Sequence, residues 1–389
     1  MSSDVRLRDL IGQRVSESSN GKRSQSGLSI QKFFSHGLMV QLLGFPSDEG
    51  VRRNGGRPGA AVAPQTIADL LMNMTPVASA ALPPSGHGLH QSGTASSQPG
   101  TASPQPGQGL PQPGTAPPQP GQDADPPESV LRKNHIALLE RTGPLEMIDC
   151  TGDVERDQER LGTRVAELLQ AGIFPIILGG GHETAYGHFL GYVMAGMDTT
   201  IVNLDAHTDV RPLKQGLAHS GSPFFQALTH PSGHCRAYHV CGLNSFSVAE
   251  EHAIFVQKMG GETHFGAPTP ELLHRLVDSG TGSNAESGSD AESGMDSEAG
   301  KTGSATKVMM TLDMDVVHQA DAPGVSAPNA AGIRSEQWLN LARTAAANAS
   351  VTSLDLCEVN PRYDRDHQTA RLAALTVWTV LLELSKRIL

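Results

Sequence analysis

Short apolar runs alternate along the chain with longer segments of helical periodicity. Runs of about four to eight apolar residues bounded by glycine or polar residues are typical of buried strands, and longer amphipathic segments are typical of helices. Strands are predicted at 38–44, 174–178, 200–204, 308–312 and 351–356, and helices at 61–74, 154–170, 184–195, 336–348 and from about 369 onward. Because strands that alternate with helices pair in parallel, we expect an α/β fold with helices on both faces of the sheet.

This alternation stops in two segments, at about 77–127 and about 279–306. The first is rich in Pro, Gly, Gln, Ser and Thr, and Gln-Pro-Gly-Thr-Ala occurs at 98–102 and again at 112–116; the second is rich in Gly, Ser and acidic residues. Such segments bury too little apolar surface to offset the entropy of ordering. We therefore predict disordered insertions at both places, within a single catalytic domain at 36–389 that follows a polar lead-in at 1–35.

Composition and charge exclude several classes of partner. The chain of 389 residues has a formal net charge of −11, which disfavours nonspecific nucleic-acid binding because that requires a basic face. No run approaches the roughly 18 apolar residues of a membrane span. The four cysteines are irregularly spaced and include no Cys-x-x-Cys, which suits a reducing compartment. We expect a cytoplasmic protein.

Three of the predicted strands end in residues of the types that bind metals. These residues are His182 after three glycines, then Asp205, His207 and Asp209, and finally Asp313 and Asp315. Taken singly, each is typical of a polar loop, a core histidine or a turn. Functional groups gather at the carboxyl ends of parallel strands, however, so the joint placement predicts that all six converge.

Four carboxylates and two imidazoles are too many ligands for one tetrahedral zinc ion. They suit two hard ions that tend toward octahedral coordination and share bridging carboxylates. Two such ions acidify a shared water and polarise the electrophile that it attacks. The pattern therefore predicts metal-assisted hydrolysis.

Four blocks of sequence resemble the ureohydrolase family, which includes arginase, agmatinase and formimidoylglutamase. The blocks are Gly-Gly-Gly-His-Glu at 179–183, Asp-Ala-His-Thr-Asp at 205–209, Thr-Leu-Asp-Met-Asp at 311–315 and Leu-Asp-Leu-Cys-Glu-Val-Asn-Pro at 354–361. The resemblance implies a three-layer α/β/α fold with a mainly parallel sheet, homo-oligomers (trimers or hexamers), and two Mn²⁺ per subunit on the six residues above. It also implies that Asp205 and Asp313 bridge the ions, that Asp209 binds one ion and shuttles a proton, and that Glu358 holds the amidine or guanidine group.

Within this family, further segments resemble formimidoylglutamase. They are 50–60, 220–224 and 360–373. Arg211 occupies the place where arginase has an asparagine that meets the substrate carboxylate, and a guanidinium there suits a carboxylate. By resemblance, the candidate substrate contacts are Arg211, Asn54, Arg57, Ser220 and Glu358. The implied reaction is hydrolysis of N-formimidoyl-L-glutamate, a dicarboxylate amidine, to L-glutamate and formamide by a metal-bridging hydroxide, a step of histidine breakdown.

Alternatives remain open at this point. The segment 44–58 is predicted as a glycine-rich loop whose arginines either grip an anionic substrate or are simply solvated. Arginase and agmatinase have a catalytic histidine where this chain has Ser220, while His219 lies one position earlier and is expected to be exposed to solvent. The competing functions are another ureohydrolase, such as arginase, agmatinase or a guanidino-acid hydrolase, and a catalytically silent, metal-stabilised scaffold.

Overall fold

One sheet organises the computed structural model, which describes residues 5–12, 37–76, 127–279 and 306–388. Within these ranges eight strands, all paired in parallel, lie in the order β2-β1-β3-β8-β7-β4-β5-β6. They are β1 (Met39–Phe45), β2 (Thr142–Met147), β3 (Ile173–Gly179), β4 (Thr199–Leu204), β5 (Cys235–Leu243), β6 (Glu262–Phe265), β7 (Lys307–Asp313) and β8 (Val351–Cys357). The α/β prediction is confirmed. The predicted insertions lie almost wholly outside the described residues.

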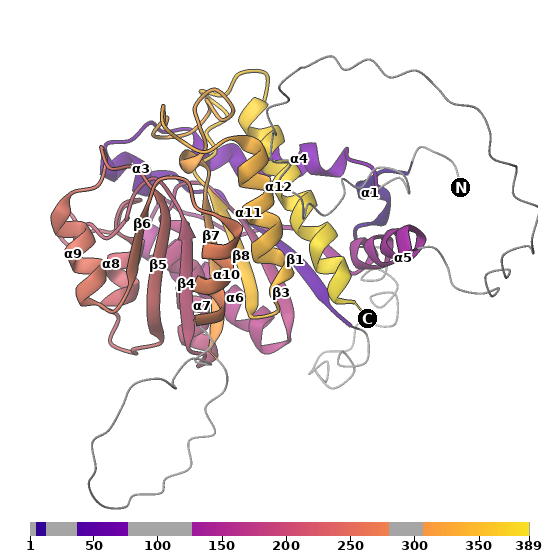
Figure 1. Ribbon diagram of the computed structural model, residues 1–389, viewed down its shortest axis with the longest axis horizontal. Coiled ribbons are helices and arrows are strands. Elements are labelled where there is room, and N and C mark those ends of the chain that lie inside the picture. The colour runs from indigo at the N-terminus through magenta and orange to yellow at the C-terminus, as the bar shows by residue number, and fades with distance from the viewer. Residues whose placement is uncertain (1–4, 13–36, 77–126, 280–305, 389) are drawn as a thin grey trace, which may run out of the picture.

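Helices cover both faces of this sheet, as Figure 1 shows. One face packs against α4 (Ala63–Met72), α5 (Pro127–Glu140), α10 (Pro270–Ser279), α11 (Ser335–Ala347) and α12 (Gln368–Leu384). The other packs against α6 (Val154–Gln170), α7 (Thr184–Ala195), α8 (Pro223–Leu228) and α9 (Glu250–Lys258). Successive strand residues enter opposite layers, as Leu42 and Leu43 do, because side chains alternate across a strand. The expected three-layer α/β/α architecture is confirmed.

The segment 44–58, predicted as a loop, contains the helix α3 (Glu49–Asn54). Six residues are too few to show an amphipathic period, so the pattern did not reveal it. Gly55 ends α3 with a φ of 83°, a left-handed conformation that glycine adopts at no steric cost. The helix predicted at 61–74 likewise begins as the 3₁₀ turn η2 (Ala60–Val62) before α4.

The predicted polar lead-in also contributes to the core. A single helical turn, α1 (Leu7–Leu10), buries both leucines against the same layer as α4 and α5. The backbone N–H of Leu7 donates to the carbonyl of Met74 at 2.9 Å, which ties this turn to the end of α4. One turn is too short for the hydrophobic pattern to predict.

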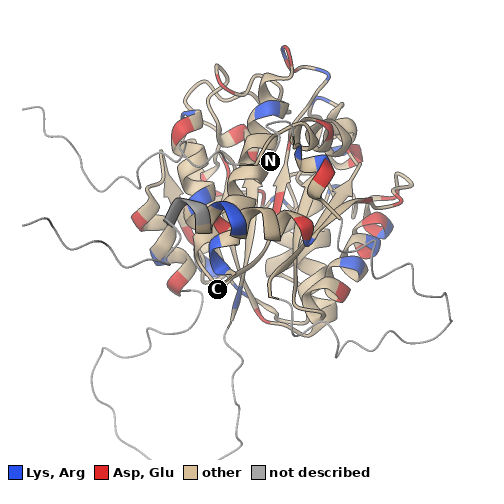
Figure 2. Cartoon of the chain, turned by 90° about the vertical axis from the view of Figure 1, so that its right-hand side faces the viewer, with Lys and Arg blue, Asp and Glu red and all other residues tan. Residues whose placement is uncertain are grey.

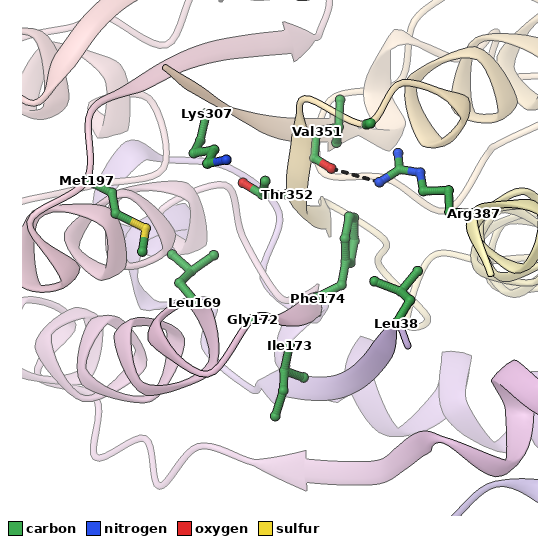
Figure 3. Close-up of a pocket in the computed structure, with 11 residues that line it drawn as sticks. Leu38, Leu169, Gly172, Ile173, Phe174, Met197, Lys307, Val351, Thr352 and Arg387 are labelled. Atoms are coloured by element: carbon green, nitrogen blue, oxygen red, sulfur yellow. Dashed lines mark hydrogen bonds between the residues drawn. The ribbon is translucent and has the colours of Figure 1, made fainter. Parts of the chain in front are cut away.

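A hollow of about 250 Å³ lies at the amino ends of the strands, opposite the edge where the candidate ligands follow the strands. Figure 3 shows it between the starts of β3, β7 and β8, with Arg387 from the turn η4 (Ser385–Arg387) donating to the carbonyl of Val351 at 3.1 Å. Its lining contains no carboxylate, imidazole or thiol. The hollow therefore cannot be the metal site that the sequence predicts.

Charges of both signs are interspersed over the helices on the side shown in Figure 2. This arrangement gives no single-sign field across that side of the molecule. In the described part of the chain, the helices are all too short or too polar to cross a bilayer.

Candidate metal and substrate site

The candidate ligands and Glu358 follow four strands that are neighbours in the sheet. In the order of the sheet, His182 follows β3, Glu358 follows β8, Asp313 ends β7, and Asp205 follows β4. Because these strands are parallel and adjacent, their carboxyl ends meet at one edge. The turn η3 (Met314–Val316) then brings Asp315 back to the same edge. Side chains far apart in sequence are thereby brought into one cluster.

The first group of ligand atoms surrounds His182. Its Nδ1 lies 3.2 Å from Asp205 Oδ2, 3.0 Å from Asp209 Oδ2 and 3.0 Å from Asp313 Oδ2. The four ligand atoms all lie within 4.8 Å of one another, and all four residues are buried. The other ring nitrogen, Nε2, lies 2.9 Å from Thr311 Oγ1. Nδ1 is thus the atom of His182 that a metal ion would contact.

The second group shares Asp205 with the first. His207 Nδ1 lies 3.5 Å from Asp205 Oδ1 and 3.1 Å from Asp315 Oδ2. Asp205 therefore turns one carboxylate oxygen to each group, as a bridging ligand requires. Asp313 belongs only to the first group, and its Oδ1 accepts a hydrogen bond from the backbone N–H of Asp315 at 2.8 Å. A bridging role for Asp313 stays a prediction.

The electrostatics of the cluster favour a bound cation. Burial raises the pKa of Asp313, and the nearby charge of Asp315 raises it further. The charge of Asp315 also raises the pKa of His207 to about 12, although burial opposes this. Without metal, protonated imidazoles therefore balance the carboxylates, and metal binding would displace those protons. Asp315 Oδ1 is buried without a hydrogen-bond partner, which suits an oxygen that ligates a metal ion.

Two residues of the cluster have a backbone conformation that side chains rarely adopt. Asp209 has a φ of 47° and Glu358 a φ of 68°. They are two of only five non-glycine residues with positive φ in the described chain. Such strain persists where the surrounding structure enforces it, and it concentrates at functional sites. Both residues predicted to be catalytic have this conformation, which they share with Gln215, Asp366 and His367, and their catalytic role stays a prediction.

Glu358 lies against the first ligand group. Its Oε1 accepts from the backbone N–H of His182 at 2.7 Å, and its own N–H donates to the carbonyl of Gly180 at 2.8 Å. Oε2 is buried with no hydrogen-bond partner. Burial raises the pKa of Glu358 to about 7, with a further contribution from Asp315. Oε2 is therefore available to accept from a further donor, although the nearby hydroxyl of Ser326 lowers the pKa of Glu358.

Three of the predicted substrate contacts form a second cluster beside Asp209. Arg211 Nη1 donates to Asn54 Oδ1 at 3.1 Å, and Asn54 Nδ2 donates to Ser220 Oγ at 3.0 Å. Arg211 Nη2 lies 3.9 Å from Asp209 Oδ1. Gly221 makes room for the guanidinium, because a Cβ there would lie only 2.6 Å from it. The structure thus places a cationic group directly beside the candidate metal ligands.

The other arginines of the segment 44–58 are already engaged by the protein. Arg57 donates to the carbonyls of Val325 and Ser326 and stacks over the ring of Tyr363 at 4.3 Å. Arg52 pairs with Asp48 at 3.2 Å, and Arg53 pairs with Glu155 at 2.9 Å. These contacts tie neighbouring segments together. Arg57 therefore lies outside the Arg211 cluster, and its predicted substrate role stays a prediction.

The expectation that His219 is exposed is wrong. Its side chain is buried, and both ring nitrogens are used by its own loop. Nδ1 accepts from the N–H of Gly221 at 3.1 Å, and Nε2 donates to the carbonyl of Pro212 at 3.0 Å. Burial lowers the pKa of this imidazole. His219 holds the loop that carries Arg211 and Ser220.

Sequence reasoning left several buried polar residues of this edge without a role. Glu183 accepts from Ser47 Oγ at 3.2 Å and from the N–H of Gly50 at 2.9 Å, and so anchors the start of α3. Burial raises the pKa of Glu183 to about 8, and the charge of Glu358 adds to this effect. Thr311 and Asp355 interrupt the apolar runs of β7 and β8. A polar residue inside a buried strand was the signal that would have found them.

Comparison with known proteins places the chain among enzymes of one family. The model of the arginase family matches residues 39–265 and 290–383. The formimidoylglutamase of Chromobacterium violaceum is 30% identical over 345 residues, which cover 88% of this chain and 86% of the relative. That of Rhodococcus jostii is 31% identical over 347 residues, which cover 87% and 84%.

A solved structure shares the architecture. The crystal structure of Trypanosoma cruzi formiminoglutamase with Mn²⁺ superposes with a TM-score of 0.64 over 98% of this chain and 99% of that one, at 19% identity. At this identity the likeness supports the fold, while the family rests on the sequence matches over most of the chain. The chain belongs to the arginase family.

Proposed function

We propose that this protein is a manganese-dependent hydrolase that converts N-formimidoyl-L-glutamate and water to L-glutamate and formamide. The relatives of similar sequence are formimidoylglutamases. The observation that carries the proposal is the Arg211–Asn54–Ser220 cluster beside the candidate metal ligands. It supplies a permanent positive charge where a substrate with carboxylates would have to bind.

Two Mn²⁺ ions fit the donor set. The first would be held by His182, Asp205, Asp209 and Asp313, and the second by Asp205, His207 and Asp315. Carboxylate-rich sets suit Mn²⁺, and the buried, unpartnered Asp315 Oδ1 is available as a further donor. When bound, the ions would supply the Lewis acidity that lowers the pKa of water and polarises the amidine carbon.

The protein's own side chains orient the substrate between two charged groups. The free Oε2 of Glu358 would accept from the amidine nitrogens, and Arg211 would meet a glutamate carboxylate at the opposite end. Asp209 turns Oδ2 toward His182 and Oδ1 toward Arg211. It is placed to take the proton of the attacking water and give it to the glutamate nitrogen as that C–N bond breaks.

A side-by-side assay tests this substrate. After loading with Mn²⁺, the protein is expected to release glutamate from formimidoylglutamate with a kcat/KM at least about a hundredfold above that for agmatine, because agmatine would bring a cation to Arg211. Arginine and guanidinobutyrate serve as the other competitors. Preferred hydrolysis of any guanidine substrate would replace the proposed substrate and leave the family unchanged.

Replacement of Arg211 gives the second test. Arg211→Ala removes a charge-assisted contact worth roughly 1.5–3 kcal/mol, which corresponds to about a ten- to hundredfold loss of kcat/KM. The loss is expected mainly in KM, because the contact is made equally in the ground and transition states. Mn²⁺ content should not change, since Arg211 lies outside both ligand groups.

Arg52→Ala is the matched control, because Arg52 is paired with Asp48 and lies outside the cluster. Its kinetics on formimidoylglutamate should stay within about twofold of the parent. A KM for formimidoylglutamate that Arg211→Ala leaves unchanged would contradict the assigned role.

We also propose a homo-oligomeric assembly and a cytoplasmic setting. All four cysteines are free in the structure, as a reducing compartment would keep them. Light scattering coupled to size exclusion measures the assembly, and a monomeric mass would refute the first expectation.

A further inference from the structure

A chain of buried hydrogen bonds starts on the side of His182 that faces away from the candidate ligands. Thr311, on β7, lies 2.9 Å from His182 Nε2 and donates to Asp355 Oδ1 at 2.7 Å. Asp355, on β8, lies 2.6 Å from His188 Nδ1 through its other oxygen. All four side chains are 0% exposed. A buried carboxylate without a strong set of donors would be costly, so this arrangement needs an explanation.

The strand pattern shows why these residues share one layer. On β8, Leu354 and Leu356 belong to the layer of α11 and α12, so the alternate residues Ser353 and Asp355 face α7. His188 of α7 contacts both of these side chains. Its Nδ1 lies near Asp355, and its Nε2 lies 2.6 Å from Ser353 Oγ. Polar residues therefore occupy buried positions that apolar side chains fill elsewhere in the sheet.

The directions of these hydrogen bonds follow from the carboxylate. An ionised carboxylate only accepts, so His188 Nδ1 must donate to Asp355, and its Nε2 then accepts from the hydroxyl of Ser353. Ser353 in turn accepts from Tyr192, 2.5 Å away. On the other side, Thr311 uses its one hydrogen toward Asp355 and can only accept from His182. Every donor in this series of hydrogen bonds points toward Asp355.

We propose that Asp355, held by His188 and acting through Thr311, is a positioning residue that fixes the tautomer and ring orientation of His182. The hydrogen of His182 is kept on Nε2, which leaves the lone pair of Nδ1 facing Asp205, Asp209 and Asp313. Histidines that ligate metals commonly donate their other N–H directly to a carboxylate or carbonyl. Here a threonine hydroxyl lies between the two. This inference rests on the proposed metal centre.

A pair of substitutions at Thr311 tests the contact. Thr311→Val removes the hydroxyl and keeps the branched shape, while Thr311→Ser keeps the hydroxyl. We expect the Mn²⁺ affinity of the site containing His182 to fall about 10- to 100-fold in Thr311→Val and to stay within about threefold of the parent in Thr311→Ser. Titration of the metal-free proteins, with free Mn²⁺ followed by electron paramagnetic resonance, measures this without any substrate. Equal affinities in the two variants would overturn the inference.

A double-mutant cycle tests the route from Asp355. Asp355→Asn alone should lower the Mn²⁺ affinity of the same site. The double variant Thr311→Val/Asp355→Asn should bind Mn²⁺ less than about threefold more weakly than Thr311→Val alone, because Thr311→Val already breaks the hydrogen-bonded connection from Asp355 to His182. Fully additive losses would show that Asp355 does not act through Thr311. Tyr192→Phe, at the far end of this series of hydrogen bonds, is the control for a general loosening of the core. A loss of Mn²⁺ affinity there as large as in Thr311→Val would also overturn the inference.

These measurements separate the inference from the proposed function. If the parent protein binds two Mn²⁺ and the variants behave as expected, the positioning role stands whatever substrate the protein hydrolyses. A parent protein that binds no Mn²⁺ would refute the metal centre and the inference together.

Discussion

Asp205→Ala is expected to abolish activity and to prevent the binding of at least one Mn²⁺. Asp205 is the only residue common to both ligand groups, and its two oxygens face His182 and His207 at 3.2 and 3.5 Å. A catalytic metal supplies several kcal/mol of transition-state stabilisation. At about 1.4 kcal/mol for each tenfold change in rate, its loss reduces kcat/KM by more than about a thousandfold. Metal analysis and turnover of formimidoylglutamate measure the two effects.

Thermal unfolding provides a readout that is independent of turnover. An ion that binds only the folded protein stabilises it by about 2.7 kcal/mol at a hundred times its Kd. The Mn²⁺-dependent rise in Tm should therefore shrink in Asp205→Ala. Asp149→Ala is the matched control, since the Asp149 side chain is 88% exposed and only pairs with Arg160. Full occupancy of both sites in Asp205→Ala would refute the shared-ligand assignment.

The layered fold was predictable because its signals are local. Strands buried on both faces appear as continuous apolar runs, and this is how β1, β3, β4, β7 and β8 were recognised. β2 contains Gly143 and Pro144 and lies at an edge, while β5 begins with polar residues, so neither gave such a run. Their places depend on pairing with distant strands, which no local pattern records.

The convergence of the candidate ligands was predictable for a different reason. Residues that follow parallel strands share one edge whatever their separation in sequence, so His182, Asp205 and Asp313 were expected to meet. The environment of single side chains was not predictable in this way. His219 is buried because the carbonyl of Pro212 and the N–H of Gly221 engage its ring, and Arg57 is held by carbonyls more than 260 residues away in the sequence. Such contacts depend on how loops pack in three dimensions.

Glu358→Gln is expected to lower kcat/KM for formimidoylglutamate by about two to three orders of magnitude and to leave Mn²⁺ binding intact. The glutamine keeps an oxygen that accepts from the N–H of His182, so the backbone beside the ligand group is preserved. It loses the charge that would meet the amidinium of the substrate. Leaving one partner of a buried ion pair uncompensated costs roughly 3–5 kcal/mol, and bound cations would keep Glu358 ionised.

Glu183→Gln is the matched control for this substitution. Glu183 is equally buried and its Oε2 also lacks a partner, but its Oε1 accepts from Ser47 and Gly50 and anchors α3, away from the ligand groups. Because burial raises the pKa of Glu183 to about 8, replacing it with an amide costs less electrostatically than replacing a fully ionised carboxylate. Its kcat/KM should stay within about tenfold of the parent. Similar losses in the two variants would mean that Glu358 only supports the fold of this edge, whereas a loss confined to Glu358→Gln assigns the free carboxylate oxygen to the substrate.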